Sequence, residues 1–159
     1  MRIDGLPLAR GIALLVPVAL MAGALGFQFI GGLTPCEMCM WQRYAHVGAI
    51  ALALLAFVVP TTLLKRVLVL LAGLAIGTSG VVGVLHAGVE YHWWAGFTPC
   101  TAALDPAKDI LDQIQNMPLV RCDTAPWSLF GVSMAGFNAL FSLAGAVAVL
   151  VAALWKPRS

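Results

Sequence analysis

Four long apolar stretches constrain the fold of this chain more than any other feature. They run near residues 8–30, 40–59, 67–87 and 129–155. Each approaches the ~20 residues that a helix needs to cross the hydrocarbon core of a bilayer. Inside lipid such a stretch must be helical, because its backbone polar groups have to be satisfied within the same segment. The sequence therefore predicts an all-α integral membrane protein, a bundle of four transmembrane helices.

Composition agrees with this class and argues against others. Of the 159 residues, 61% are hydrophobic and 10% are charged, whereas a soluble domain carries roughly a quarter charged residues. The net charge of +2 is too small to indicate a nucleic-acid partner. The first apolar stretch is too long for a signal peptide and no small-residue cleavage site follows it, so we expect it to be a span. Residues 1–159 are then expected to form a single membrane domain.

Basic residues predict the orientation of the bundle. Six of the nine flank the spans on one face: Arg2, Arg10, Lys65, Arg66, Lys156 and Arg158. The positive-inside rule makes this face cytoplasmic, so residues 1–7, 60–66 and 156–159 are expected inside the cell. The loops near 31–39 and 88–128 then face outward. For a bacterial inner membrane the outside is the periplasm, where disulfides form and persist.

The longer outer loop contains a pattern typical of a short helix. Asp105-Pro106 is a helix start, with an acidic N-cap and proline at the first helical position. Apolar residues then recur at helical spacing up to Pro118: Ile110, Leu111, Ile114 and Met117. We predict a short periplasmic amphipathic helix that lies either in the membrane interface or against its own loop.

All four cysteines fall on the outer side, in two pairs. Cys36 and Cys39 form a Cys-x-x-Cys motif at the expected start of the second span, where the helix N-terminus stabilises a thiolate. Cys100 and Cys122 can form a second disulfide, either as a structural staple or as a pair that exchanges with the first through a mixed disulfide. A four-thiolate zinc site needs closer pairs, and a c-type haem site needs histidine where Met40 stands, so the sequence favours neither.

Two further side chains share a helix face with Cys39. Arg43 follows it by one turn and His46 by two. A guanidinium at this place either stabilises a thiolate or polarises a carbonyl oxygen, or it extends from the interface into water. The position of Arg43 one turn after Cys39 favours the functional interpretation. The shared face motivates a proton-handling hypothesis for His46, although for all three histidines, His86 and His92 included, we expect a solvated or packing role.

The residues around the first cysteine pair resemble the signature of the disulfide-bond formation protein B (DsbB) family. The resemblance covers nearly the whole chain in helix number, cysteine order and orientation. It rests, besides the two loop cysteines, on Gly26-Phe27-Gln28, Pro35-Cys36-Glu37-Met38-Cys39, Met40-Trp41-Gln42-Arg43-Tyr44 and Pro126-Trp127.

This resemblance implies a quinone-dependent protein-disulfide oxidoreductase. Such a protein reoxidises a DsbA-like periplasmic dithiol oxidase of the thioredoxin fold and passes the electrons to a membrane quinone, either ubiquinone or menaquinone. By position, Cys100 would form the mixed disulfide with the partner, and Cys122 would exchange with Cys36. Cys39 would face the quinone, with Arg43 helping to bind it.

Three alternatives remain at the level of sequence. A quinone reductase resembling the vitamin K epoxide reductase family also has four helices and four cysteines, but there the loop cysteines come first, whereas here Cys36 and Cys39 do. A non-catalytic membrane protein would hold inert structural disulfides that stay oxidised with or without quinone. An oxidase of the DsbB kind dedicated to one particular substrate is the third alternative.

Overall fold

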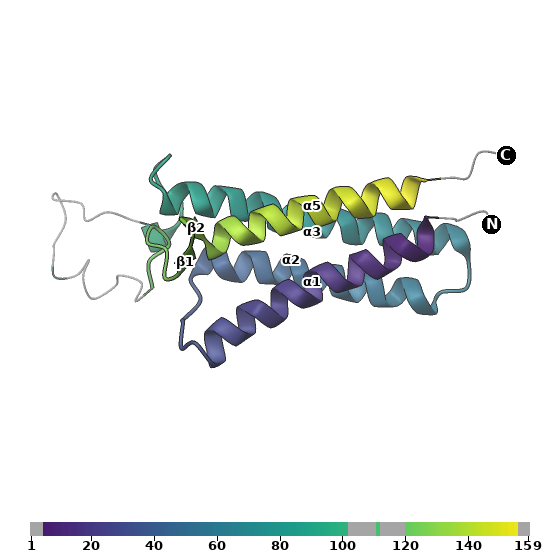
Figure 1. The fold of residues 1–159 in the computed structure, drawn as a ribbon, viewed down its shortest axis with the longest axis horizontal. Helices are drawn as coiled ribbons and strands as arrows, with labels where there is room; N and C mark the ends of the chain where they lie inside the picture. Colours follow the sequence, from purple (N-terminus) through teal and green to yellow (C-terminus); the bar gives the residue numbers. More distant parts are fainter. Residues whose placement is uncertain (1–4, 102–110, 112–119, 156–159) are drawn as a thin grey trace.

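Each of the four apolar stretches forms one long helix in the computed structural model, which describes residues 5–101, 111 and 120–155. The helices are α1 (Leu6–Phe29), α2 (Glu37–Val58), α3 (Thr62–Glu90) and α5 (Met134–Leu154). All four are long and apolar enough to cross a membrane. They lie side by side in a bundle, with the start of α1 and the end of α5 at the same end (Figure 1). The predicted bundle of four membrane helices is confirmed.

Short elements close the other end of the bundle, between α3 and α5 (Figure 1). They are the 3-10 turn η1 (Pro99–Thr101) and an antiparallel hairpin of β1 (Ser128–Leu129) and β2 (Val132–Ser133). Phe130 and Gly131 form the hairpin turn, both with positive φ, as a tight two-residue turn requires. The amphipathic helix predicted for residues 105–117 lies outside the described residues, apart from Leu111.

Helix ends differ from the limits of the apolar stretches because capping, rather than hydropathy, sets them. The helix α2 begins at Glu37, since the Cys36 sulfur accepts a hydrogen bond from the Cys39 N–H at 3.2 Å. The helix α5 begins only at Met134, where the Ser133 hydroxyl caps it, because the hairpin occupies the preceding residues. The helix α3 extends beyond its apolar stretch at both ends, so Lys65 lies in its first turn rather than in a loop.

The half of the bundle away from the cysteines has a core of small side chains, which we call the alanine-packed half. Its buried residues include Ala9, Ala13, Ala49, Ala53, Ala56, Ala72, Ala146, Ala152 and Ala153. Here α3 approaches α5 closely: a Cβ atom added to Gly73 would lie 3.0 Å from Val149 Cγ1. Farther along, one added to Gly80 would lie 2.8 Å from Leu143 Cγ. These glycines therefore serve helix packing, as is common in membranes.

The outward faces of the helices are apolar. Large side chains there are mostly exposed, for example Leu15 (68%), Phe29 (75%), Val58 (76%) and Leu63 (75%). In water such a surface would be a strong aggregation liability. Around four membrane-length helices it is the surface expected to contact lipid.

Candidate redox site

The two cysteine pairs meet at the end of the bundle that carries the hairpin, which we call the cysteine end. Cys100 and Cys122 form a disulfide, whereas Cys36 and Cys39 are free thiols with their sulfur atoms 2.7 Å apart. Three of the four are buried in one cluster, with Cys39 packed against it. The sulfur of Cys36 lies within 4.8 Å of the sulfur of Cys122. A dithiol therefore faces a disulfide across a short gap.

The start of α2 determines how the two thiols differ. Cys36 is the N-cap residue, so its sulfur lies beside the first free backbone N–H groups of the helix. A hydrogen bond to the Cys39 sulfur, together with burial, raises the pKa of Cys36 above the usual range of a thiol. Cys36 thus keeps its proton and donates it toward Cys39, which is the accepting sulfur of the pair.

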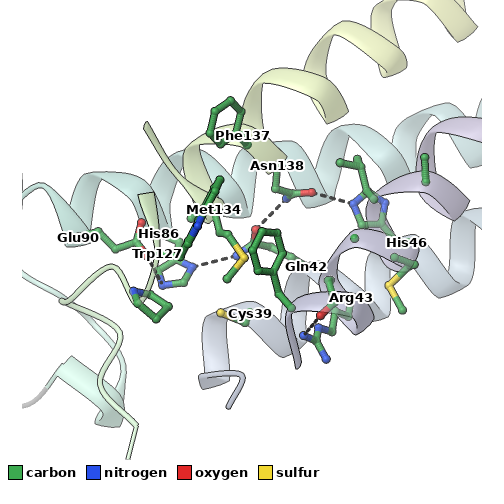
Figure 2. Close-up of a pocket in the computed structure, with 18 of the residues that line it drawn as sticks. Cys39, Gln42, Arg43, His46, His86, Glu90, Trp127, Met134, Phe137 and Asn138 are labelled. Atoms are coloured by element: carbon green, nitrogen blue, oxygen red, sulfur yellow. Dashed lines mark hydrogen bonds and ion pairs between the residues drawn. The ribbon is translucent and has the colours of Figure 1, made fainter. Parts of the chain in front are cut away.

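Next to Cys39 lies a cavity of about 330 Å³, with walls from all four helices and from the segment before the hairpin. Most of its lining is apolar, and three aromatic rings form part of one wall. The ring centroids of Phe27 and Trp127 are 4.9 Å apart, and those of Trp127 and Phe137 are 6.1 Å apart. Figure 2 shows the polar residues that line it: Cys39, Gln42, Arg43, His46, His86, Glu90 and Asn138.

The Arg43 guanidinium is held by α1. It donates hydrogen bonds to the Gln28 side-chain oxygen and, at 3.2 Å, to the carbonyl oxygen of Ala24. Arg43 is half-buried and lines the cavity together with Cys39. Its head group is thus fixed between two helices at the cavity wall instead of extending into water, and its partner is the last residue of the Gly26-Phe27-Gln28 motif.

His86 lies against the dithiol, although we expected it to be solvated or to pack. Gln42 Nε2 donates to the Met38 carbonyl oxygen and to His86 Nδ1, both at 3.0 Å. Because an amide nitrogen only donates, His86 Nδ1 accepts, and Nε2 carries the hydrogen of the neutral ring. That Nε2 lies 3.5 Å from the Cys36 sulfur and 3.6 Å from a Glu90 carboxylate oxygen. His86 is therefore positioned to donate toward the sulfur.

A second amide carries the network deeper into the bundle. Asn138 Nδ2 donates to Gln42 Oε1 at 2.8 Å, and Asn138 Oδ1 lies 2.9 Å from His46 Nε2. Figure 2 shows these contacts beside the cavity. The result is a continuous run of buried and half-buried polar side chains from α2 with its N-cap residue, α3 and α5, in the order Cys36, His86, Gln42, Asn138 and His46.

The same geometry argues against a metal centre among the described residues. Ligand atoms of Cys36, His86 and Cys122 all lie within 4.8 Å of one another. However, the Cys122 sulfur is bonded to Cys100 and is not a thiolate. A structural zinc site needs four ligands, with each sulfur ligand deprotonated. The arrangement suits exchange between a thiol and a disulfide better.

The structure brings together every site residue that the sequence singled out. The four cysteines lie at one end of the bundle, and Arg43 and His46 line the cavity beside Cys39; His92 is exposed, as expected. Sequence reasoning gave no role to the two amides or to the aromatic wall, although Gln42, Phe27 and Trp127 lie in the motifs that carry the resemblance. The available signal was the presence of Gln42 and Asn138 inside apolar spans, where polar residues are costly and often functional.

A protein that places a dithiol between a disulfide and an apolar cavity inside a membrane bundle is a membrane thiol–disulfide oxidoreductase. The comparison with protein families gives the particular kind: the family model "Disulfide bond formation protein DsbB" matches residues 8–152. The chain therefore belongs to the DsbB family. Proteins of this family reoxidise DsbA with quinone as the acceptor, and membership makes this chain a membrane protein-disulfide oxidoreductase rather than a relative of vitamin K epoxide reductase.

Curated relatives agree with the family model. Disulfide bond formation protein B of Verminephrobacter eiseniae is 33% identical over 140 residues, which cover 80% of this chain and 75% of the relative. The protein of the same name in Pasteurella multocida is 32% identical over 72% of this chain and 67% of its own length. Disulfide bond formation protein B 1 of Burkholderia lata is 31% identical over 90% and 85%. No solved structure gives a significant match.

Proposed function

We propose that this chain takes electrons from a DsbA-like periplasmic dithiol protein and passes them to a membrane quinone, either ubiquinone or menaquinone. The observation that carries the proposal is an unbroken series of contacts. The disulfide of Cys100 and Cys122 lies beside Cys36, Cys36 touches Cys39, and Cys39 lines the cavity.

The first half of the reaction is thiol–disulfide exchange. A thiolate of the partner attacks Cys100, a mixed disulfide forms, and Cys122 leaves as a thiolate. The second partner thiol then releases the oxidised partner. When Cys36 and Cys39 are joined, the Cys122 thiolate attacks Cys36, Cys39 leaves, and the Cys100 thiolate displaces Cys36. This restores the loop disulfide and leaves the dithiol, which is the redox state of the cysteines described above.

The second half reoxidises the dithiol. Cys36 and Cys39 form their disulfide, and two electrons and two protons leave for the acceptor. A quinone bound in the cavity would accept these two electrons and two protons. The N-cap geometry keeps the sulfurs in contact, and His86 donates toward Cys36.

The residues of the cavity fit a quinone head group. Apolar and aromatic side chains, Trp127 among them, offer a flat ring surface to stack on. The Arg43 guanidinium at the wall would donate a charge-assisted hydrogen bond to a carbonyl oxygen of the ring. Cys39 lines the same space, so a ring bound there would lie in the same cavity as this residue.

Charge supports a periplasmic position for the cysteine end. Arg10, Lys65 and Arg66 lie at the opposite end, near the start of α1 and the start of α3. By the positive-inside rule we expect that end in the cytoplasm and the cysteines on the outer side of the inner membrane of a bacterium. There the partner dithiol and an oxidising compartment are both available.

Quinone reduction by the purified chain in detergent tests the proposal. The donor is a reduced thioredoxin-fold dithiol protein, and ubiquinone and menaquinone are supplied in turn. We expect turnover with at least one of them, lost in Cys39→Ser and in Cys100→Ser. The control Thr78→Val removes an exposed hydroxyl of α3 that donates a hydrogen bond to the Leu74 carbonyl of the same helix, and it should retain turnover. The proposal would be contradicted by a folded protein that reduces neither quinone, whether the donor is a general dithiol oxidase or a candidate dedicated partner.

A further inference from the structure

A threonine hydroxyl lies against the loop disulfide, on the Cys100 side. The Thr98 Oγ1 atom is 3.0 Å from the Cys100 sulfur. Because that sulfur is bonded to Cys122 it carries no hydrogen, so the hydroxyl donates and the sulfur accepts. Both residues are buried, with Thr98 5% and Cys100 4% exposed. The contact is therefore a hydrogen bond shielded from water, which strengthens it.

The turn η1 holds this donor in place through bonds that do not involve the disulfide. The Thr101 N–H donates to the Thr98 carbonyl oxygen at 2.9 Å, and the Thr101 hydroxyl donates to the same oxygen at 2.7 Å. The Thr98 N–H donates to the Thr101 hydroxyl at 3.3 Å. Pro99, between Thr98 and Cys100, has a fixed φ. We therefore expect the donor to stay beside the Cys100 sulfur when the bond to Cys122 breaks.

The Thr98 hydroxyl is not one of the groups that hold the turn. The turn uses the backbone groups of Thr98 and the hydroxyl of Thr101, whereas the Thr98 hydroxyl contacts the sulfur. A sulfur atom in a disulfide is a weak acceptor. A hydrogen bond to an ionised acceptor is roughly twice as strong as one between neutral groups. The hydroxyl therefore matters most in the states in which Cys100 carries a negative charge.

One step of the proposed reaction creates that charge. In the mixed disulfide, one sulfur of the partner is bonded to the Cys100 sulfur. The second thiolate of the partner attacks the partner sulfur, the bond to Cys100 breaks, and its electron pair stays on Cys100. The partner leaves with its own disulfide, oxidised by two electrons, and the loop pair has gained these electrons. Cys100 is thus the leaving group of this step.

We infer that the Thr98 hydroxyl speeds release of the oxidised partner by stabilising the Cys100 thiolate as it leaves. The inference rests on the proposed function, which supplies the partner and the mixed disulfide. Thr98 is then a further catalytic residue, because it contacts a reacting atom. Its hydrogen bond is stronger in the transition state than in the mixed disulfide, as catalysis requires. A donor already placed where charge develops needs no reorganisation during the reaction.

Single-turnover exchange in detergent measures the release step. The chain carries Cys36→Ser/Cys39→Ser, keeps its loop disulfide and is mixed with a reduced thioredoxin-fold dithiol protein; acid quenching at successive times gives the mixed disulfide and the oxidised donor. Thr98→Val keeps the side-chain shape and both backbone groups of the turn. In this variant we expect the mixed disulfide to form at its normal rate, to accumulate, and to release oxidised donor about tenfold more slowly. Thr98→Ser keeps the hydroxyl and should release the donor at the normal rate.

The matched control is Thr124→Val. It makes the same change two residues after the other loop cysteine, at an exposed hydroxyl that lies 3.5 Å from the Asp123 carboxylate. Both rates should be normal in this variant. Equal release rates in folded Thr98→Val and in the unchanged background would overturn the inference. If Thr98→Val does not fold, Thr98→Ala removes the same hydroxyl and decides in its place.

A titration distinguishes failure of this inference from failure of the proposed function. When the other three cysteines are replaced by serine, Cys100 is the only thiol, and the pH dependence of its alkylation by iodoacetamide follows its thiolate. We expect the midpoint at higher pH in Thr98→Val, and unchanged in Thr98→Ser and Thr124→Val. Equal midpoints would overturn the inference. A donor that forms no mixed disulfide with the unchanged background would overturn the proposed function and the release step with it, whereas a difference in midpoints would still support the contact between Thr98 and the thiolate.

Discussion

The same four helices build both halves of the bundle, but the two halves differ in how their buried positions are filled. In the alanine-packed half, buried positions are filled mostly by alanine, with Leu6, Ile76 and two valines, and side chains pack closely against glycine. Toward the cysteine end a cavity opens between the helices, although α3 and α5 stay close at Gly80. The buried polar residues that the structure describes lie between the middle of the bundle, at Ser79 and Ser142, and the cysteine end. In the alanine-packed half the helices are held by close packing of small side chains. The cysteine end has instead a polar network and a cavity beside Cys39.

The comparison teaches where stability and chemistry reside. Close packing of small residues is a main source of helix association in a membrane. Cavities and buried polar atoms reduce stability unless they are filled or paired. We therefore expect changes in the alanine-packed half to affect folding, and changes at the cysteine end to affect turnover.

The largest expected effect is on turnover and comes from Cys36→Ser. A serine hydroxyl cannot form either disulfide of the relay, so quinone-coupled oxidation should fall by more than about a thousandfold. Thermal unfolding in detergent should change little, since the serine keeps the N-cap position. Retained turnover in this variant would break the proposed relay and the division between the two halves.

A smaller effect on turnover is expected for Arg43→Ala. Loss of a charged donor at the cavity wall should raise the quinone concentration needed for half-maximal rate by about tenfold or more. Exchange between the partner and the loop disulfide should proceed at its normal rate, which trapping of the mixed disulfide measures. If the quinone dependence is unaltered, Arg43 serves only to tie α2 to α1 through Gln28 and Ala24.

Gly73→Val tests the alanine-packed half. The Cβ atom of the new side chain would lie 3.0 Å from Val149 Cγ1 and 3.3 Å from Leu150 Cδ2. Overpacking of this kind costs about 1–3 kcal/mol of unfolding free energy. Chemical denaturation in mixed detergent measures the loss, and turnover per folded molecule should be normal. The matched control is Gly48→Val, because nothing lies within 4 Å of a Cβ atom at that position. Equal stability of the two variants would contradict the packing difference.

The smallest effect is expected for Asp123→Asn, just after Cys122. The Arg121 guanidinium binds this carboxylate and holds the pKa of Asp123 below its usual range. The pair therefore contributes stability above the unfolded pKa of the carboxyl group, and the contribution is lost as the pH falls through the lower folded value. Because the pair is at the surface, the variant should lose at most about 1 kcal/mol at neutral pH and nothing in strong acid. A larger loss, measured by unfolding at both pH values, would show that the loop contributes more than its surface contacts indicate.

Much of this fold could be predicted from the sequence because the bilayer leaves few choices. Length and hydropathy define four helices, and spacing along α2 brings Cys39, Arg43 and His46 to one cavity. The helix ends could not be predicted from hydropathy, since they depend on local caps such as Ser133 and on the hairpin before α5.

The polar network could not be predicted from the sequence, for a different reason. His86, Gln42 and Asn138 come from three helices, and their contacts depend on the rotation of each helix about its own axis. Sequence spacing defines a face within one helix but not which faces of two helices meet. The hydrogen bond between Gln28 and Arg43 could not be predicted from spacing either, although both residues belong to motifs that resemble the same family.

The most direct test of the relay is whether Cys36 and Cys122 join when they are the only cysteines left. The variant Cys39→Ser/Cys100→Ser is purified in detergent, exposed to a mild oxidant and mapped by mass spectrometry, with a sample unfolded before oxidation as the control. Since their sulfur atoms lie within 4.8 Å, we predict an intramolecular Cys36–Cys122 disulfide that forms rapidly in the folded protein and slowly in the unfolded control. Thiols that stay reduced in the folded protein, or that join only between molecules, would contradict direct exchange between the two pairs.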